Sequence, residues 1–385
     1  MIATWLELLT GYVLFDSLAF RTAMAALTAF AFALLLGGPT IRWLRSHRVR
    51  DNVDTSGSDD LRARSEREGK HNTPTLGGSF LVAALLLAVL LWGDLESVPV
   101  QLGVLLTAGV AAVGFVDDYV KLTQPKRRGL SRRAKMVGLS IVALAVLSGL
   151  VWFAHLTGRE TLLTLYLPVA DELFSERYLS FAAWGLAGLL AFVLFEWFVI
   201  VGSSNAANIV DGLDGLAAGV LLISGLALTI FCYVTGRADW TDYLGLPYVP
   251  AAGDMAIVGG ALVGACMGFL WFNAYPAQVF MGDSGSLPLG ALLAWMAVVA
   301  KQELALPLIG IVLVLDLGSS WLQTFWYRRS GGERLFTCAP VHHGLQLYGG
   351  VFTRGTPMHE VKVVVRFWIL AAAGALASLA LLKVR

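Results

Sequence analysis

The chain has 385 residues, of which 57% are hydrophobic and only 14% are charged. This composition excludes an ordinary soluble domain and indicates a polytopic membrane protein. The formal net charge of +1 says nothing by itself about partners, because the placement of basic residues matters more in such a chain, and no nucleic-acid partner is expected.

An N-terminal amphipathic stretch precedes ten apolar runs, each judged against the roughly 20 residues that a helix needs to cross a bilayer. The first run lacks a basic leader and a small-residue cleavage site, which predicts a retained helix rather than a cleaved signal peptide. No internal repeat is evident, which disfavours a duplicated transporter. We predict an all-α polytopic integral membrane protein, with one membrane-embedded domain over residues 1–385. The predicted spans are 20–41, 76–92, 99–116, 136–156, 181–203, 213–235, 252–274, 285–300, 304–326 and 363–383.

Basic residues collect in alternate loops between these spans. Loops rich in Lys and Arg remain in the cytoplasm, so both termini are predicted to be periplasmic. The polar segments 205–214, 273–286 and 337–346 then share the cytoplasmic face, where they can form one active-site cleft. The predicted cytoplasmic loops carry Arg42, Arg45, Arg48, Arg50, Arg62, Arg64, Arg67, Lys70, Lys121, Lys126, Arg127, Arg128, Arg132, Arg133, Lys135, Arg328, Arg329, Arg334, Arg354 and Lys362, and the intervening loops only Arg159, Arg177, Arg237 and Lys301.

The third span ends in GFVDDYVK, with Asp117 and Asp118 adjacent at the membrane surface. Neighbouring carboxylates repel unless a cation or proton lies between them, so the pair predicts a Mg²⁺ site or a base with a perturbed pKa. A solvated helix end is the alternative. Lys121 follows one helical turn later, and the basic run that ends at Lys135 can hold phosphate or anionic lipid headgroups. For its four arginines we favour a topological and lipid-binding role.

The segment NAANIVDGLDGLAAG follows the fifth span. Asn205 and Asn208 are three residues apart, as are Asp211 and Asp214, so each pair shares a face if the segment is helical. Four such groups at the mouth of an apolar helix are costly to bury without a ligand, and capping explains at most one of them. Acidic pairs on facing helices can hold a diphosphate through bridging Mg²⁺.

The segment NAYPAQVFMGDSGS, residues 273–286, emerges between two apolar runs. Asp283 is flanked by Gly282, Ser284 and Gly285, which let the backbone approach a ligand and offer N–H donors at the start of a helix. Phosphate and a divalent cation both fit this arrangement. Simple capping of the helix by Asp283 or Ser284 is the alternative.

The last polar segment reads RLFTCAPVHHGLQLYGG. His342 and His343 can donate to phosphate oxygens or exchange protons near neutral pH. Zinc is disfavoured, since no Cys or His lies at ligand spacing. Pro340 and Gly344 bracket the pair, which predicts a shaped loop rather than a helix.

Taken together, these motifs resemble the phospho-N-acetylmuramoyl-pentapeptide transferase (MraY) family, over residues 40–380. The resemblance implies transfer of phospho-MurNAc-pentapeptide from UDP-MurNAc-pentapeptide to undecaprenyl phosphate, giving lipid I and UMP. It also implies Mg²⁺ dependence, a bacterial cytoplasmic membrane with its lipid as surroundings, and a homodimer. The motifs that carry it are KHNTPTLGG at 70–78, VDDYVK at 116–121, NAANIVDGLDGLAAG at 205–219, NAYPAQVFMGDSGSLPLG at 273–290, APVHH at 339–343 and VVVRFW at 363–368.

The resemblance also implies residue roles. Asp283 corresponds to the Mg²⁺ ligand, Asp117 and Asp118 to the acidic pair that activates the lipid phosphate, and His342 to a further catalytic position. Lys70, Asp214 and Phe280 correspond to nucleoside contacts, with Phe280 stacking on uracil. The remaining expected substrate-binding positions are Thr75, Lys121, Asn208, Asp211, Asn273, Gln323 and His343.

Three positions depart from the family pattern. The usual third histidine is Gly344, the acid that follows is Gln346, and an acidic position in the ninth span, usually Glu, is Asp316. With Gly344 in that place, His342 and His343 carry the whole imidazole contribution of the segment. We therefore expect Gly344→His to be tolerated and His342→Ala not.

Two rival functions follow from the same residues. The UDP-GlcNAc polyprenyl-phosphate transferases share the acidic motifs, but APVHH is closer to the muramoyl-pentapeptide type. A transporter or flippase would place its charges at mid-span, whereas most acidic groups here lie at span ends. An aspartyl phospho-enzyme and direct attack by the lipid phosphate are both open at this level, and direct attack is favoured.

Overall fold

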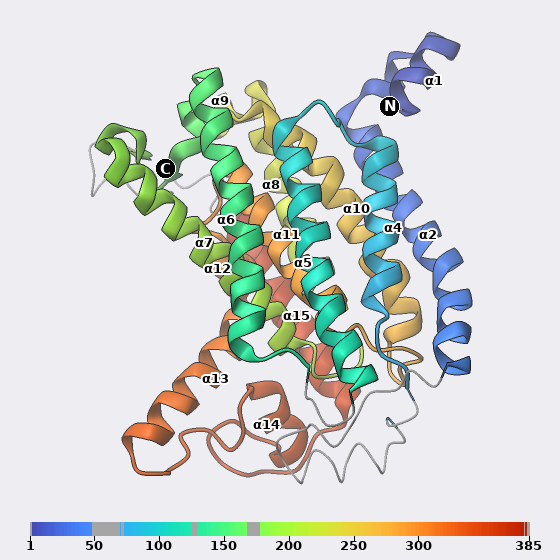
Figure 1. Cartoon of the computed structure of the whole chain (residues 1–385), viewed down its shortest axis with the longest axis vertical. Helices are drawn as coiled ribbons and strands as arrows, with labels where there is room; N and C mark the ends of the chain where they lie inside the picture. Colours follow the sequence, from blue (N-terminus) through green and yellow to red (C-terminus); the bar gives the residue numbers. More distant parts are fainter. Residues whose placement is uncertain are drawn as a thin grey trace.

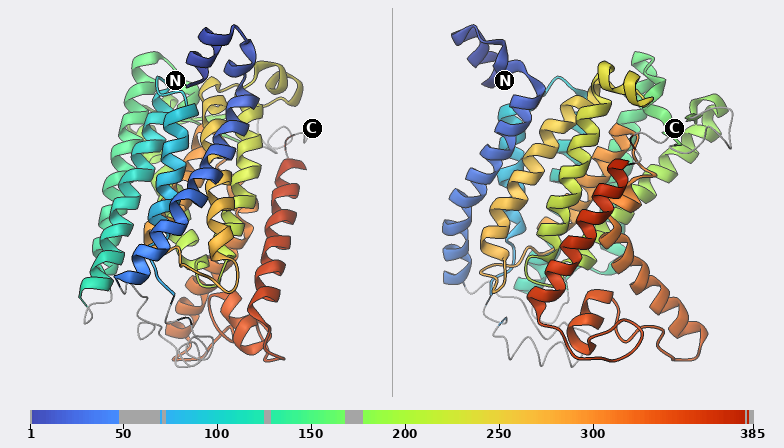
Figure 2. Two further views of the ribbon diagram at one scale, coloured as in Figure 1. Left: turned by 90° about the vertical axis from the view of Figure 1, so that its right-hand side faces the viewer. Right: turned by 180° about the vertical axis from the view of Figure 1, so that it is seen from behind.

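The computed structural model describes residues 2–47, 70, 73–124, 129–167, 178–380 and 382. Helices run side by side through most of the molecule (Figure 1). Helix α1 and the C-terminal end of α15 lie toward the same end of the bundle (Figure 2). The predicted basic residues at 48–67 and 126–128 lie outside the described residues. The helices are α1 Ile2–Thr10, α2 Leu18–Ser46, α4 Gly78–Trp92, α5 Val98–Thr123, α6 Arg132–Thr157, α7 Gly185–Val210, α8 Leu216–Thr235, α9 Ala238–Leu244, α10 Pro250–Asn273, α11 Asp283–Ala300, α12 Leu306–Ile309, α13 Ile311–Arg329, α14 Val341–Tyr348 and α15 Glu360–Ala380, with 3-10 turns at Val13–Asp16, Glu160–Leu163 and Ala182–Trp184.

Eight helical segments in the described part of the chain are long and apolar enough to cross a membrane, so the all-α polytopic prediction is confirmed. Two of the ten predicted spans differ from the rest. The second is α4, which has 15 residues, and the ninth breaks at Gly310 into the short α12 and the longer α13. The count of ten membrane crossings stays a prediction.

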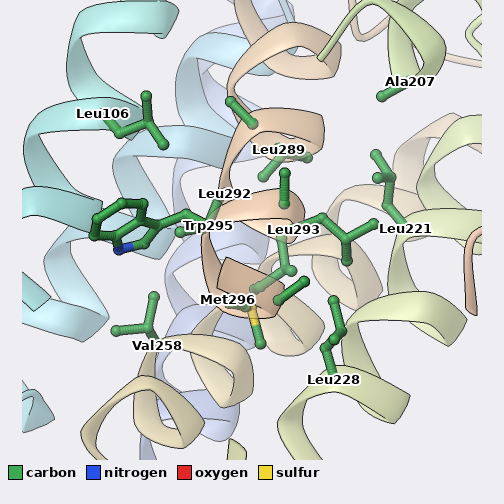
Figure 3. Close-up of a cluster of buried hydrophobic side chains, with 14 of the residues drawn as sticks. Leu106, Ala207, Leu221, Leu228, Val258, Leu289, Leu292, Leu293, Trp295 and Met296 are labelled. Carbon is green, nitrogen blue, oxygen red and sulfur yellow. The ribbon is translucent and has the colours of Figure 1, made fainter. Parts of the chain in front are cut away.

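Helix α11 forms the centre of the bundle. All 18 of its residues are buried, and it packs against α5, α7, α8 and α4. The indole N–H of Trp295 donates to the backbone oxygen of Pro99, 2.9 Å away, near the far end of the helix. This packing fixes the axis of α11 and therefore the position of Asp283, its first residue. Figure 3 shows Leu289, Leu292, Leu293, Trp295 and Met296 of α11 among Leu106, Ala207, Leu221, Leu228 and Val258 of its neighbours.

Helix α10 packs closely on α2 because three glycines lie one turn apart on the contact face. A Cβ atom at Gly260 or Gly264 would collide with backbone oxygens of α2, and one at Gly268 would lie 2.9 Å from the oxygen of Phe30. Small residues at this spacing let helix backbones approach each other in a membrane, where dispersion forces between packed atoms stabilise the pair. The contact anchors α10, whose C-terminal end leads into the polar loop 274–282. Figure 2 shows the two helices running side by side from two directions.

The end of the bundle remote from the polar loops carries the one departure from an all-helical fold among the described residues. Strand β1, Thr164–Tyr166, pairs antiparallel with β2, Tyr178–Ser180. Lys301, between α11 and α12, is buried, and its ammonium lies 3.2 Å from a Glu303 oxygen and donates to the oxygen of Leu162 at 3.0 Å. Lys301 is therefore neutralised inside the protein and does not count as an exposed basic residue of its loop.

Candidate active site

Three carboxylates, those of Asp117, Asp118 and Asp283, form a carboxylate cluster where α5 meets the start of α11. Their oxygens lie within 4.8 Å of one another, and all three residues are buried. Helix α5 approaches α11 so closely that a Cβ atom at Gly114 would collide with the backbone of Asp283. Glycine at that position brings together two acidic motifs that are far apart in the sequence.

Two lysines contact the carboxylate cluster. The Lys121 ammonium lies 2.7 Å from an oxygen of Asp117 and 3.2 Å from one oxygen each of Asp118 and Asp283. Lys135, one turn into α6, lies 3.2 Å from Asp117 and contacts Asp283 directly. Two ammonium groups thus face three carboxylates, which leaves one negative charge. From its sequence, Lys135 was expected only at the end of a basic run that can hold phosphate or anionic lipid headgroups. Its position early in a helix after the VDDYVK motif was the one signal for a place beside the aspartates.

The donor set of the carboxylate cluster fits a hard divalent cation. Mg²⁺ prefers carboxylate oxygens, and the Lys121 ammonium, within 3.2 Å of an oxygen of each aspartate, marks the place where positive charge is stabilised. Asp283 is also held by Asn208, whose amide donates to it at 2.7 Å and to Ser286 at 3.0 Å. Asp117, Asp118 and Asp283 are the residues that would hold Mg²⁺.

The N-terminus of α11 is itself bound by the cluster. The backbone N–H of Ser284 donates to Asp118 at 3.0 Å, and that of Gly282 donates to Asp211 at 3.2 Å. Gly282 has φ +71°, a backbone conformation that residues other than glycine rarely adopt. A carboxylate at a helix N-terminus is stabilised by the free N–H groups and by the helix dipole. Asp118 thus orients the backbone that carries Asp283.

The segment 205–214 is only partly helical. Helix α7 ends at Val210, so the condition of a helical segment is met for Asn205 and Asn208 and is not met for Asp211 and Asp214. Asp214 instead faces a second network. Asn205 donates to the backbone oxygen of Val201 at 2.8 Å, and no hydrogen bond in the described ranges joins it to the carboxylate cluster. Asn208 and Asp211 therefore contact the N-terminal end of α11, through Asp283 and the Gly282 N–H respectively, and the other two residues do not.

A second group, here called the Lys70 network, consists of Lys70, Asp214, Gln346 and Glu360. The Lys70 ammonium lies 2.8 Å from Asp214 and 2.7 and 2.8 Å from the two oxygens of Glu360. Burial opposes the charge on Lys70, but the carboxylates of Glu360 and Asp214 outweigh burial, so the pKa of Lys70 is raised above its ordinary value. The backbone N–H of Ala277 donates to Asp214 at 3.0 Å and ties the network to the loop 274–282. Glu360, which lies three residues before VVVRFW, was not among the predicted site residues.

Three further predicted residues line or support this loop. Thr75 is buried, and its hydroxyl lies 3.0 Å from where a Cβ atom of Gly282 would stand. Asn273 is buried and bonded at both ends of its amide, accepting from Gly215 N at 3.0 Å and donating to Val279 O at 2.9 Å, so it braces the loops. Phe280 is half-buried, and its N–H donates to Pro74 O at 2.8 Å. Stacking of Phe280 on uracil stays a prediction.

The two histidines lie on helix α14, so the prediction of a non-helical loop there is wrong. Pro340 has extended backbone angles and precedes the helix, a position where its missing N–H costs nothing. The Nδ1 atom of His342 lies 2.7 Å from a carboxylate oxygen of Asp316 on α13, and both side chains are fully buried. His342 Nε2 has no hydrogen-bond partner among the described residues and faces Gly212, between Asp211 and Asp214. His343 lies 3.3 Å from Gln346.

Gln323 lies apart from these groups. Its side-chain oxygen on α13 accepts from the backbone N–H groups of Leu335 at 3.1 Å and Phe336 at 2.9 Å. No hydrogen bond between described residues joins it to the carboxylate cluster or to the Lys70 network. The structure therefore places Gln323 as a brace of the loop before α14, and its predicted substrate contact stays a prediction.

The surroundings of Gly344 oppose the expected tolerance of Gly344→His. A Cβ atom there would lie 3.1 Å from Thr337 Oγ1 and 3.2 Å from Cys338 O, closer than an ordinary van der Waals contact. We now expect Gly344→His to destabilise the protein by about 1–3 kcal/mol through overpacking, and Gly344→Ala by less. Thermal melts of the purified variants in detergent measure the difference. A Gly344→His melting temperature equal to that of the wild type contradicts this account.

Comparisons with known proteins agree with the geometry. Residues 100–301 match the model of glycosyl transferase family 4. The chain is 37% identical over 380 residues to a phospho-N-acetylmuramoyl-pentapeptide-transferase of Thermodesulfovibrio yellowstonii, a match that covers 98% of this chain and 97% of that protein. The matched region contains the carboxylate cluster and both of its lysines. The chain therefore belongs to glycosyl transferase family 4 and, within it, to the phospho-N-acetylmuramoyl-pentapeptide transferases.

Proposed function

We propose that this protein transfers phospho-MurNAc-pentapeptide from UDP-MurNAc-pentapeptide to undecaprenyl phosphate, forming lipid I and releasing UMP. The observation that carries the proposal is the cluster of three buried aspartates with two half-buried lysines at the end of apolar helices, in a chain of this family. The reaction transfers a phospho-sugar from a nucleotide diphosphate to a lipid phosphate, so the negative oxygens of both substrates must be neutralised at a membrane surface. A site of this composition meets that need.

The residues of the cluster divide the work of the transfer. Asp117 and Asp118 orient the lipid phosphate and accept its proton. An oxygen of that phosphate then bonds to the sugar-linked phosphorus, while the anhydride bond to UMP breaks. Lys121 and Lys135 stabilise the negative charge on the transferred phosphoryl group and on the departing UMP. Mg²⁺, when bound by the aspartates, supplies further neutralisation of the diphosphate charge. Direct attack needs no covalent phospho-enzyme.

The two charged groups suit different ends of the nucleotide substrate. The carboxylate cluster provides two ammonium groups, whereas the Lys70 network has one ammonium for the two carboxylates of Asp214 and Glu360. Both groups keep one negative charge, but among the described residues only the cluster has three carboxylates placed to hold Mg²⁺, which would make it a site for phosphate. The Lys70 network suits an uncharged base with N–H and C=O groups. The loop 274–282 contacts both groups through Ala277 and Gly282. We therefore place the diphosphate at the cluster and the nucleoside at the Lys70 network.

The proposal includes a bacterial cytoplasmic membrane, with the site on its cytoplasmic face and both termini periplasmic. The polyprenyl chain would stay in membrane lipid while its phosphate enters the site from the side. Helix α1 and the C-terminal end of α15 lie toward one end of the bundle and α14 lies at the other, which supports this orientation (Figures 1 and 2). Labelling of single cysteines with an impermeant reagent on oriented vesicles tests it, and reaction at residues 70 or 342 from outside would refute it. A homodimer is also proposed, and the mass of the protein in detergent measures it.

Release of UMP by the purified protein tests the activity. We expect UMP from UDP-MurNAc-pentapeptide and undecaprenyl phosphate together, none when either substrate is omitted, and none in EDTA. UDP-GlcNAc in the same assay separates the rival transferase activity, which would be shown by UMP from that donor instead. Absence of UMP with both donors, in protein with a cooperative thermal melt, would refute the proposal.

A further inference from the structure

Glu360 is a buried carboxylate that no step of the proposed mechanism uses. It is the first residue of α15, and its side chain is fully buried. One oxygen accepts from the Lys70 ammonium at 2.7 Å and from the backbone N–H of Asp214 at 2.7 Å. The other accepts from Lys70 at 2.8 Å and from the Gln346 amide at 3.1 Å. A single side chain therefore joins four segments that are distant in the sequence.

The arrangement places Glu360 behind the residues that can meet a ligand. The Lys70 side chain is 17% exposed and Glu360 is 0% exposed, so a ligand can reach Lys70 and cannot reach Glu360. Glu360 cannot contact a substrate directly without leaving its three donor groups. It can, however, set where the Lys70 ammonium lies and how the turn 211–215 is held. Because a buried charge without its partners is strongly unfavourable, the carboxylate and the ammonium hold each other in place.

Gln346 completes this environment in a way that depends on its being an amide. Its Nε2 donates to Glu360, which a carboxylate at position 346 could not do. The departure from the family pattern noted at this position thus coincides with a hydrogen bond to Glu360. With glutamine at position 346, the Lys70 network has two carboxylates and one ammonium group and keeps one negative charge. A glutamate at that position would leave two.

We propose that Glu360 is a positioning residue, which holds the Lys70 ammonium in the geometry that binds the nucleoside end of the donor substrate. This inference rests on the proposed function. It predicts that Glu360 affects binding of the UDP donor through Lys70, and that it does not affect the phosphoryl transfer or the binding of the lipid phosphate. Lys70 without Glu360 would still pair with Asp214 but would lose its bidentate partner.

A double-mutant cycle on the full-length protein in detergent tests the inference. We expect Glu360→Gln to raise KM for UDP-MurNAc-pentapeptide by about tenfold, with kcat and KM for undecaprenyl phosphate changed by less than about threefold. Because Glu360 acts through Lys70, the double variant with Lys70→Met should be no worse than Lys70→Met alone, within about threefold. The exchange Glu360→Gln with Gln346→Glu keeps the charge of the network and should restore part of the lost affinity. Glu333→Gln, at an exposed glutamate, is the matched control and should behave like wild type.

Several outcomes would overturn the inference. Additive effects of Lys70→Met and Glu360→Gln would show that Glu360 does not act through Lys70. A fall in kcat at constant KM would assign it to the chemical step, and parallel losses in all constants with a lowered melting temperature would leave it only a structural role. Failure of the proposed function is distinguishable, because the wild type would then release no UMP. In that case calorimetric binding of UMP to wild type and to Glu360→Gln still tests the positioning role, and equal affinities would reject it.

Discussion

Asp283→Asn is expected to reduce the rate of phospho-sugar transfer by at least about a thousandfold. Asp283 is the residue on which Lys121, Lys135 and Asn208 converge, and it begins the fully buried helix α11. An amide removes one hard oxygen ligand and one charge from the place where Mg²⁺ would bind. Steady-state UMP release at several Mg²⁺ concentrations measures the loss.

The fold should survive this change. The wild-type cluster sets three carboxylates against two ammonium groups, and Asp283→Asn leaves two against two. The charges of the cluster then balance, so we expect a melting temperature close to that of the wild type. Asp242→Asn, at an exposed position on α9, is the control for a change of the same chemistry away from the site. Near-normal turnover of Asp283→Asn at ordinary Mg²⁺ concentration would show that the central assignment is wrong.

His342→Ala is expected to lower kcat by about 10- to 100-fold, the size of one lost charge-assisted hydrogen bond in the transition state. His342 is held by Asp316, and its Nε2 faces Gly212 without a partner in the described part of the chain. That atom is therefore free to hold or donate a proton where the turn 211–215 meets the carboxylate cluster. Single-turnover kinetics with saturating substrates measure the effect on the chemical step.

A second variant separates chemistry from stability, because His342→Ala also leaves Asp316 buried without its partner. His342→Gln retains a donor for Asp316 but cannot carry the proton. We expect His342→Gln to recover the melting temperature and not the rate. His155→Ala, at an exposed position on α6, should match the wild type in both measurements. Full activity of His342→Gln would reduce His342 to a packing role.

The described helices match most of the predicted spans because a bilayer imposes strict rules on length and hydrophobicity. A spanning helix satisfies its own backbone hydrogen bonds, so its limits are local properties of the chain. The two discrepancies are confined to single spans. Helix α4 has only 15 residues, and the ninth predicted span is interrupted at Gly310, after which α13 carries more polar residues. The small β1–β2 ribbon was missed because its strands have three residues each.

A multi-pass membrane protein of the phosphosugar transferase type can be predicted from the sequence, because apolar runs and acidic motifs are patterns within short windows of residues. All three aspartates of the cluster were predicted in the same way. Which charges meet depends on the tertiary fold. Lys135 reaches Asp283 across 148 positions and Glu360 reaches Lys70 across 290, and no local pattern encodes such a contact. The sequence likewise did not predict that Asp211 would accept from the Gly282 N–H while Asp214 would join the Lys70 network. This difference depends on where α7 ends against the packed start of α11.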